Sequence, residues 1–196
     1  VSHELRTPLT SIKGACETVM EDPEMPPETR QYFLDMALTE SDRMTRIVSD
    51  LLVLSRLDNK RTQWKLENFD LCRSVSRLIE VMRVDIEARE HTVTFTSEGH
   101  IPPITADRER IEQVIVNVIS NSVKYTPVGG KIDVSVTSAD DKISFRVKDN
   151  GIGIPEEEQE HIFERFYRVD KSHSREIGGT GLGLAIARNA VLMHRG

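Results

Sequence analysis

The sequence predicts a two-part fold: an all-α helical hairpin that pairs into a dimeric four-helix bundle, followed by an α+β sandwich. Three observations predict it. Two long stretches with helical apolar periodicity flank a proline-rich break near the start of the chain. Alternating, β-branched stretches appear only after residue 60, and glycine-rich segments follow in the last third. We therefore expect two domains: 1–60 and 69–196, joined by a linker at 61–68.

The composition excludes several classes of protein. The chain has 196 residues and a formal net charge of −6, whereas a general nucleic-acid binder normally carries a basic excess. Cys16 and Cys72 lack metal-type spacing, so we expect two buried thiols in a reducing compartment and no disulfide. No apolar run is long enough to cross a bilayer. Because the sequence begins without Met, we expect native residues upstream.

The hairpin is expected from two helices and the loop between them. The first helix, over 1–20, carries an apolar seam at alternating steps of four and three: Leu5, Leu9, Ile12, Cys16 and Val19. Pro8 lies inside this pattern and predicts a local kink, and the prolines of 21–28 form the loop. A second helix is expected over about 28–58, with these residues on its apolar side: Phe33, Met36, Met44, Ile47, Val48, Leu51, Leu52 and Leu54. One hairpin cannot bury both faces of its seam, so we expect a homodimer.

The second domain is expected to place helices on one face of a mixed sheet. The pattern predicts, in order, a helix over 70–90, a strand over 91–96, a short extended piece over 101–106, a helix over 107–123, and strands over 131–137 and 142–148 joined at 139–141.

Two glycine-bearing segments have the features of a nucleotide site. Residues 149–155 follow a strand directly, and Gly151 and Gly153, before Ile154, let the backbone approach a ligand. Asp149, at the strand end, is placed to accept a hydrogen bond from a base amino group. A plain Asp-Asn-Gly turn is the alternative. The second segment comprises Gly179, Thr180, Gly181, Leu182 and Gly183, and it leads into an apolar helical stretch.

The second glycine segment differs from two common phosphate-binding motifs. Glycines at a helix N-terminus expose N–H groups, and the helix dipole favours phosphate there. No Gly-Lys-Ser/Thr triplet follows, which excludes a P-loop. No βαβ unit with a downstream ribose acid surrounds it, so the dinucleotide fingerprint also fits poorly.

Residues 117–125 lie on the helix before the hairpin strands. Asn117 and Asn121 are four residues apart and share a face, so their amide oxygens could serve Mg²⁺. Lys124 could meet phosphate and Tyr125 could lie against adenine; a polar surface stripe is the alternative.

Residues 163–171 stand between the two glycine segments. Arg168 and Lys171 follow two phenylalanines. This pattern predicts a segment that the phenylalanines anchor at its start and that continues as a mobile, positively charged lid over phosphates. Alternatively, Phe163 and Phe166 are core residues at helical spacing.

The start of the chain pairs His3 with Glu4, which alone predicts no more than a surface ion pair. Together with the other segments it resembles the catalytic core of a bacterial sensor histidine kinase of two-component signalling. Residues 2–9 are similar to the phospho-acceptor box, 117–125 to the N box, 149–155 to the first glycine box, 164–170 to the F box and 179–184 to the second glycine box. Residues 165–170 and 175–184 resemble the branch of envelope sensors that includes WalK, VicK and PhoR. Ser122 departs from the alanine frequent in the family, and the family usually extends the chain before His3 and after Gly196.

The resemblance implies a dimeric hairpin domain and a Bergerat-type domain that binds ATP with Mg²⁺. It implies that His3 attacks the γ-phosphate and that Glu4 accepts a hydrogen bond from the other ring nitrogen. The phosphate then passes to an aspartate of a response regulator. Thr7, one turn after His3, is either a phosphatase residue that positions water or a first-turn cap. Upstream transmembrane segments would make this chain the cytoplasmic part of a membrane-anchored sensor.

Two rival hypotheses remain at this point. A Bergerat-fold ATPase of the gyrase or heat-shock kind uses a glutamate base at the helix position that Asn117 occupies here. A non-catalytic scaffold would not need an intact set of nucleotide motifs. The loop at 21–28 leaves open whether phosphate moves within a chain or between chains.

Overall fold

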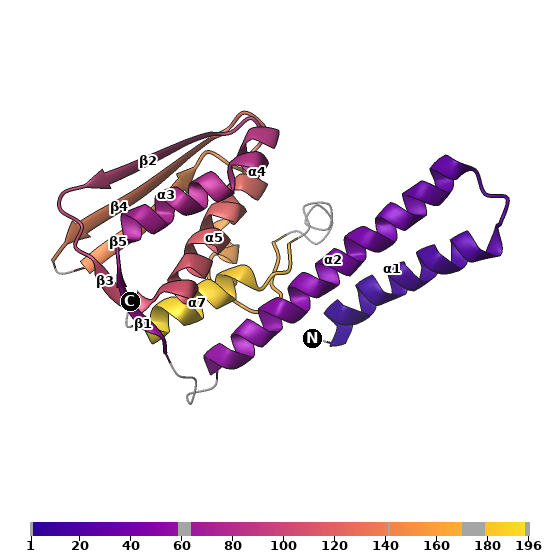
Figure 1. The fold of residues 1–196 in the computed structure, drawn as a ribbon, viewed down its shortest axis with the longest axis horizontal. Coiled ribbons are helices and arrows are strands. Elements are labelled where there is room, and N and C mark those ends of the chain that lie inside the picture. The colour runs from indigo at the N-terminus through magenta and orange to yellow at the C-terminus, as the bar shows by residue number, and fades with distance from the viewer. Residues whose placement is uncertain (1, 59–63, 141, 170–178, 195–196) are drawn as a thin grey trace.

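The computed structural model describes residues 2–58, 64–140, 142–169 and 179–194. A helical hairpin of α1 (Ser2–Glu21) and α2 (Pro27–Asp58) leads into a second domain, as Figure 1 shows. That domain contains β1 (Leu66–Phe69), α3 (Leu71–Val81), α4 (Arg83–Ala88), β2 (Thr92–Glu98), β3 (Ile104–Asp107), α5 (Arg108–Tyr125), β4 (Lys131–Ala139), β5 (Lys142–Asp149), the 3₁₀ turn η1 (Glu156–Glu158) and α7 (Gly183–Met193). The predicted fold class, a helical region followed by an α/β domain, is confirmed.

The hairpin is held by small residues and by its turn. Helix α1 continues through Pro8, so the expected kink does not interrupt it, and the Pro8 ring is fully buried. Ala15 is buried as well, which allows close packing of α1 on α2. In the turn, the Met25 N–H donates to the Asp22 carbonyl at 3.2 Å, and Arg30 donates to the Pro23 carbonyl at 2.8 Å. The proline-rich loop is therefore a compact, hydrogen-bonded connection.

The expectation that both thiols are buried was wrong for Cys16. Cys16 is an exposed free thiol, and Leu9 of the same seam is 55% exposed. The reason is that the side of α1 that is buried in the hairpin centres on Pro8 and Ala15, so Ile12 and Val19 of the predicted seam are partly buried while Leu9 and Cys16 stay exposed. Cys72 is partly buried in the second domain, and this burial raises the pKa of its thiol. In the described part of the chain, no helix combines the length and apolar character that a bilayer crossing requires.

The second domain is a mixed sheet covered by helices on one face. Strands β2, β4 and β5 pair in that order, β2 parallel to β4 and β4 antiparallel to β5. Alternate residues of β4, namely Ile132, Val134 and Val136, are almost fully buried in the core. They pack in one cluster with apolar residues of α3 and α5, and Figure 1 shows both helices on the same side of the sheet. The predicted mixed sheet is therefore confirmed.

Two expected boundaries need correction. Strand β1 pairs antiparallel with β3, so 66–68 belong to a sheet and not to the expected linker at 61–68. Residues 59–63 lie outside the described residues. The single helix expected over 70–90 is interrupted at Met82, where φ is −87° and ψ is 3°. The Met82 N–H is shared between the carbonyls of Leu78 and Ile79, so the chain tightens and changes direction while the Met82 side chain stays buried.

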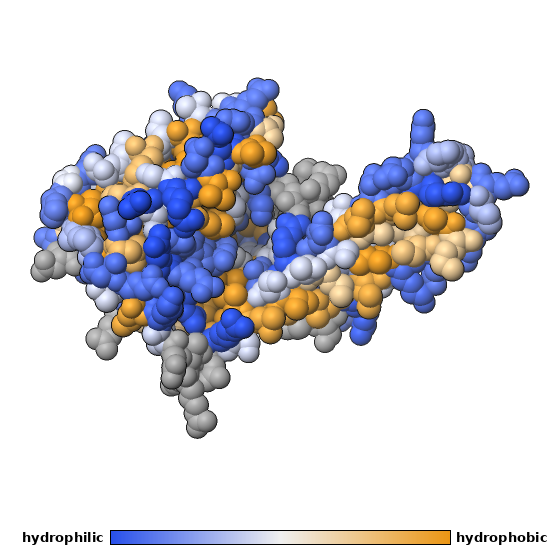
Figure 2. All heavy atoms as spheres, viewed as in Figure 1, coloured by the Kyte–Doolittle hydropathy of each residue, from blue (hydrophilic) through white to orange (hydrophobic). Residues whose placement is uncertain are grey.

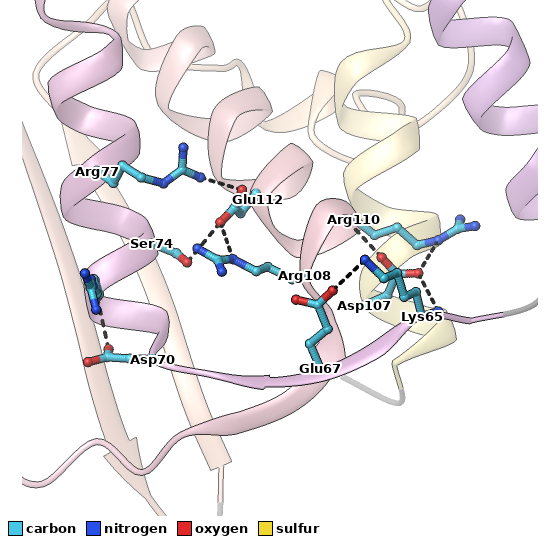
Figure 3. A network of polar contacts seen from close by, with 10 residues as sticks. Lys65, Glu67, Asp70, Ser74, Arg77, Asp107, Arg108, Arg110 and Glu112 are labelled. Carbon is cyan, nitrogen blue, oxygen red and sulfur yellow. Dashed lines mark hydrogen bonds and ion pairs between the residues drawn. The ribbon is translucent and has the colours of Figure 1, made fainter.

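A polar network fixes α3, α5, β1 and β3 to one another (Figure 3). Glu112 of α5 accepts hydrogen bonds from Ser74 at 3.0 Å, Arg77 at 2.6 Å and Arg108 at 2.9 Å. Burial alone raises the pKa of Glu112, but these three donors outweigh it and hold the pKa below its ordinary value. Asp107 caps α5 by accepting from the Arg110 N–H at 3.3 Å, and it also accepts from the Lys65 N–H at 3.3 Å. The network fixes the position of α5, which carries the predicted N box.

Candidate functional site

Helix α5 is the scaffold on which the predicted nucleotide segments meet. One side of α5 contributes Val114 to an apolar cluster with α7 and α2, while Ile119 and Val123 enter the main core. The polar face that remains carries Asn117, Asn121 and Lys124, none of them fully buried. The burial of apolar residues on both sides therefore fixes which way the polar residues point.

Asn117 joins the N box to the second glycine segment. Its Nδ2 donates to the Gly183 carbonyl at 2.9 Å, and its Oδ1 accepts from Gln113 at 2.9 Å. A Cβ on Gly183 would lie 3.5 Å from Asn117 Cγ, so the two segments are in contact. Helix α7 starts at Gly183 without a side-chain cap, which leaves the N–H groups of its first turn for a ligand.

The first glycine segment is attached to the C-terminal end of α5. Asp149 accepts a hydrogen bond from Ser122 Oγ at 2.8 Å through Oδ2, and one from the Gly151 N–H at 3.0 Å through Oδ1. A Cβ on Gly151 would lie 2.6 Å from the Tyr125 carbonyl oxygen, so only glycine permits this approach. Both carboxylate oxygens of Asp149 are therefore oriented, and each keeps a lone pair for a further donor.

Phe166, at the start of the predicted lid, contacts the second glycine segment directly. The Phe166 N–H donates to the Gly181 carbonyl at 2.8 Å. Gly181 has φ +71°, and a Cβ there would lie 2.9 Å from the Phe166 backbone. Arg168 and the Tyr125 hydroxyl approach Gly179, because a Cβ on Gly179 would lie 3.3 Å from Arg168 Nη2 and 3.8 Å from Tyr125 Oη. At Gly151 and Gly181 the backbone comes close to other backbone atoms of the protein.

Several other predicted site residues make fewer contacts with the rest of the site. Gly153 has φ +70° with open space around it, and Ile154 is 44% exposed. Asn121 makes no side-chain hydrogen bond within the described residues. Lys171 lies outside the described residues. Phe166 packs against the cluster with α7, whereas Phe163 is 39% exposed and lies under the Arg188 guanidinium at 5.9 Å.

The phospho-acceptor segment lies at the start of α1. His3 is exposed and lines an open hollow of about 310 Å³ together with Arg6, Thr7, Thr10 and Ser11. The Thr7 hydroxyl donates to the His3 carbonyl at 3.2 Å, as helical threonines commonly do. Glu4 is half-buried, and no hydrogen bond joins its side chain to His3 in the described hairpin. Adjacent residues on a helix do not face each other, which accounts for this separation.

The motif pattern did not point to three contacts of the site. Gln113 orients Asn117 from one turn away, a spacing that could have been noticed. Ser122 stood out as a departure, but its contact with Asp149 could not be read from residues 27 apart. Thr180 donates to Asp50 of α2 at 2.7 Å across 130 residues, for which the sequence carries no signal.

Comparisons with known proteins agree with this geometry. Residues 1–60 match the family model of the His Kinase A (phospho-acceptor) domain. Residues 106–196 match that of the histidine kinase-, DNA gyrase B- and HSP90-like ATPases. The sensor histidine kinase WalK of Bacillus subtilis (strain 168) is 40% identical over 198 residues, which cover 100% of this chain and 32% of WalK. The chain thus spans about a third of the length of that relative.

Two solved structures share the arrangement of both parts. The complex of histidine kinase ThkA with response regulator protein TrrA has a TM-score of 0.74 and 28% identity, covering 90% of this chain and 52% of that chain. Full-length ShkA in complex with AMPPNP has a TM-score of 0.71 and 26% identity, covering 97% of this chain and 39% of that chain.

Proposed function

The chain belongs to the sensor histidine kinase family of two-component signalling, and on that premise we propose that it binds ATP in its second domain and transfers the γ-phosphate to His3. The observation that carries the proposal is the convergence on α5 of segments far apart in sequence. Asn117 contacts Gly183, Ser122 contacts Asp149, and Tyr125 lies near Gly179. We assign the phospho-acceptor role to 1–58 and the nucleotide role to 66–194.

ATP recognition divides between the two ends of this site. Asp149, held by Ser122 and the Gly151 N–H, accepts the hydrogen bond of the adenine amino group. Tyr125 lies against the base. The phosphates lie at the N-terminus of α7, near Lys124 and Arg168, where free N–H groups and positive charge favour them. ShkA, with which the chain shares its fold, was crystallised with the ATP analogue AMPPNP.

A magnesium ion fits the residues near α7 when nucleotide is present. The described residues contain no cluster of three or more His, Cys, Asp or Glu side chains that would hold a metal by themselves. Asn117 Oδ1 keeps one lone pair after accepting from Gln113, and the Asn121 amide makes no hydrogen bond to the described residues. These amide oxygens would join phosphate oxygens and water around Mg²⁺. The bound ion supplies neutralisation of phosphate charge during transfer.

His3 is the acceptor of the phosphate. A neutral ring nitrogen attacks the γ-phosphorus, the P–N bond forms as the bond to the β-γ bridging oxygen breaks, and ADP leaves. The imidazolium charge that develops is stabilised by Glu4, which must change rotamer to reach the second ring nitrogen. The exposure of His3 and the open hollow beside it give the γ-phosphate access from solvent.

The phosphoryl group then passes to an aspartate of a response-regulator receiver domain. The ThkA relative was solved in complex with such a regulator, TrrA. Thr7 lines the same hollow as His3, which supports a role for its hydroxyl in positioning a water for the reverse reaction, dephosphorylation of the regulator. Its bond to the His3 carbonyl is weak enough to be exchanged for that water.

The chain is proposed to act as a homodimer attached to a membrane through further segments. Exposed apolar side chains run along the hairpin, which Figure 2 shows as an orange stripe. The match to the His Kinase A domain supports pairing of two hairpins into a four-helix bundle. The WalK relative is about three times as long as this chain and is named a sensor, which supports sensing segments outside the matched region.

Incubation with γ-labelled ATP and Mg²⁺ tests the function. We expect protein-bound label that is acid-labile and alkali-stable, absent from His3→Gln, and transferable to a receiver domain. Release of free phosphate without labelled protein would instead identify an ATPase. Glu17→Gln, on the exposed side of α1, is the matched control and should label normally.

A further inference from the structure

The last turns of α2 pack on the nucleotide domain beside the second glycine segment. Leu54 and Leu57 of α2 are 1% and 4% exposed and share an apolar cluster with Leu182 and Ile186, which are 0% and 1% exposed. Figure 1 shows α7 lying alongside this part of α2. The contact therefore brings polar residues of α2 next to the proposed phosphate end of the site.

Two acids of α2 make direct contacts there. Thr180 Oγ1 donates to Asp50 Oδ2 at 2.7 Å and accepts from the Leu182 N–H at 3.3 Å. Arg165 Nη2 lies 2.7 Å from both carboxylate oxygens of Asp58. A hydroxyl has one proton to donate, so Thr180 cannot serve Asp50 and a phosphate oxygen at the same time.

The charges around Asp50 match those that a phosphate would meet. Burial lowers the pKa of Lys124, and Arg46 adds to the effect while Asp50 opposes it. Arg168 and Arg89 lower the pKa of Lys124 further, so Lys124 lies among several cations. Burial raises the pKa of Asp50, and Thr180, Lys124 and Arg46 counteract that rise. Asp50 is thus a partly desolvated carboxylate that accepts a hydrogen bond from the Thr180 hydroxyl and is influenced by the charges of Lys124 and Arg46.

We infer that Asp50 is an internal ligand of the nucleotide site, its carboxylate standing where a nucleotide phosphate binds, so that ATP and the docked end of α2 compete. This inference rests on the proposed function, because Lys124 and the start of α7, which Thr180 precedes, are assigned to the phosphates. The single Thr180 proton cannot serve a carboxylate and a phosphate at once, and the two anions would repel each other. Binding of nucleotide therefore releases α2 from the glycine segment, and docking of α2 weakens nucleotide binding.

The apolar contact and the Asp58–Arg165 pair do not themselves compete with nucleotide. They hold α2 near the site, so that Asp50 acts at high effective concentration. A neutral side chain at residue 50 keeps this docking and removes the anion. Asp50→Asn is therefore the variant that separates competition from anchoring.

Calorimetric titration of the full chain with a non-hydrolysable ATP analogue, ADP and adenosine tests the inference. Asp50→Asn should bind the analogue and ADP about three- to tenfold more tightly than the unmodified chain. Adenosine, which has no phosphate, should bind both proteins equally. Asp42→Asn changes the same charge on an exposed part of α2 and should leave all affinities unchanged.

The outcomes separate this inference from the function on which it rests. Equal or weaker analogue binding by Asp50→Asn, with normal binding by the unmodified chain, would overturn the inference alone. Failure of the unmodified chain to bind the analogue would overturn the proposed function. A gain that extends equally to adenosine would show that Asp50 acts through docking and not at the phosphates. If Asp50→Asn unfolds, Asp50→Ser replaces it in the same titration with the same expectations.

Discussion

The Asp149 carboxylate is held from two sides, and the hydroxyl of Ser122 supplies one of its contacts at 2.8 Å. Ser122→Ala removes that donor, so Asp149 retains the Gly151 N–H alone. We expect the affinity for an ATP analogue to fall about three- to tenfold, since a hydrogen bond to a charged group contributes roughly 1 kcal/mol or more. Calorimetry measures it, with Ser76→Ala on an exposed position of α3 as the control. Unchanged affinity would remove Ser122 from adenine recognition.

Gly181 combines a positive φ with a close approach to the backbone of Phe166. A Cβ there would lie 2.9 Å from the Phe166 backbone at φ +71°. Gly181→Ala should lower the free energy of unfolding by about 1–3 kcal/mol and weaken nucleotide binding. Gly14→Ala adds the same methyl group in open space on α1, and should raise stability by roughly 0.5–1 kcal/mol. Urea unfolding compares the two, and shifts of the same sign would contradict the prediction.

A site residue could be predicted from the sequence when the residues it acts with are its neighbours in the chain. Asn117, Asp149 and Gly183 could be assigned because each lies in a motif whose residues are consecutive in the chain. Asp50 could not, because its partner Thr180 is 130 residues away and the contact depends on how the two domains pack. The glycine segments were predicted from their spacing, but part of the role of these glycines is contact with other backbone, which spacing does not reveal.

The contact between α3 and α5 depends on Glu112, whose pKa lies below the ordinary value of 4.5. Burial raises that pKa, but Arg77, Arg108 and Ser74 outweigh it. Because the folded-state pKa is lower than the unfolded one, the carboxylate stabilises the fold fully above pH 4.5. This stabilisation is lost as the pH falls through the folded-state pKa.

Glu112→Gln should therefore lower the free energy of unfolding by about 1–3 kcal/mol at pH 7 and have little effect at acid pH. Thermal unfolding of both proteins between pH 7 and pH 3 measures the difference. Glu80→Gln, in an exposed ion pair with Arg83, should change stability by about 0.5 kcal/mol or less. A constant difference across the pH range would show that Glu112 acts through packing and not through its charge.

At the scale of elements, long periodic stretches were predictable and short ones were not. Helices α2 and α5 begin and end within two residues of expectation, since each repeats its apolar pattern over several turns. The interruption at Met82 escaped prediction because Met82 still points into the core at helical spacing. Strand β1 was placed in the linker because four residues paired only with β3 leave no clear alternation.

At the scale of the whole molecule, the face of α2 opposite the nucleotide domain is an uncovered apolar surface. Leu34, Leu38, Val48 and Leu52 are all more than 40% exposed. At about 100° per residue they fall within one narrow stripe, and Leu52 lies about 160° from Leu54, which packs on α7. Docking of the second domain therefore leaves the stripe free for a second hairpin. The structure of a single chain cannot show the burial of this stripe, because that burial requires a second copy of the chain.

Leu38→Glu should convert the proposed homodimer into a monomer without unfolding the chain, since Leu38 is 63% exposed and its replacement disturbs no core. A charge in the centre of a four-helix bundle would have to be buried unpaired, which costs several kcal/mol. Light scattering after size-exclusion chromatography measures the mass, and circular dichroism checks the helix content. Thr29→Glu adds the same charge on another side of α2 and should remain dimeric. A dimer that survives Leu38→Glu would place the interface elsewhere, and the stripe would then be free to bind the receiver domain.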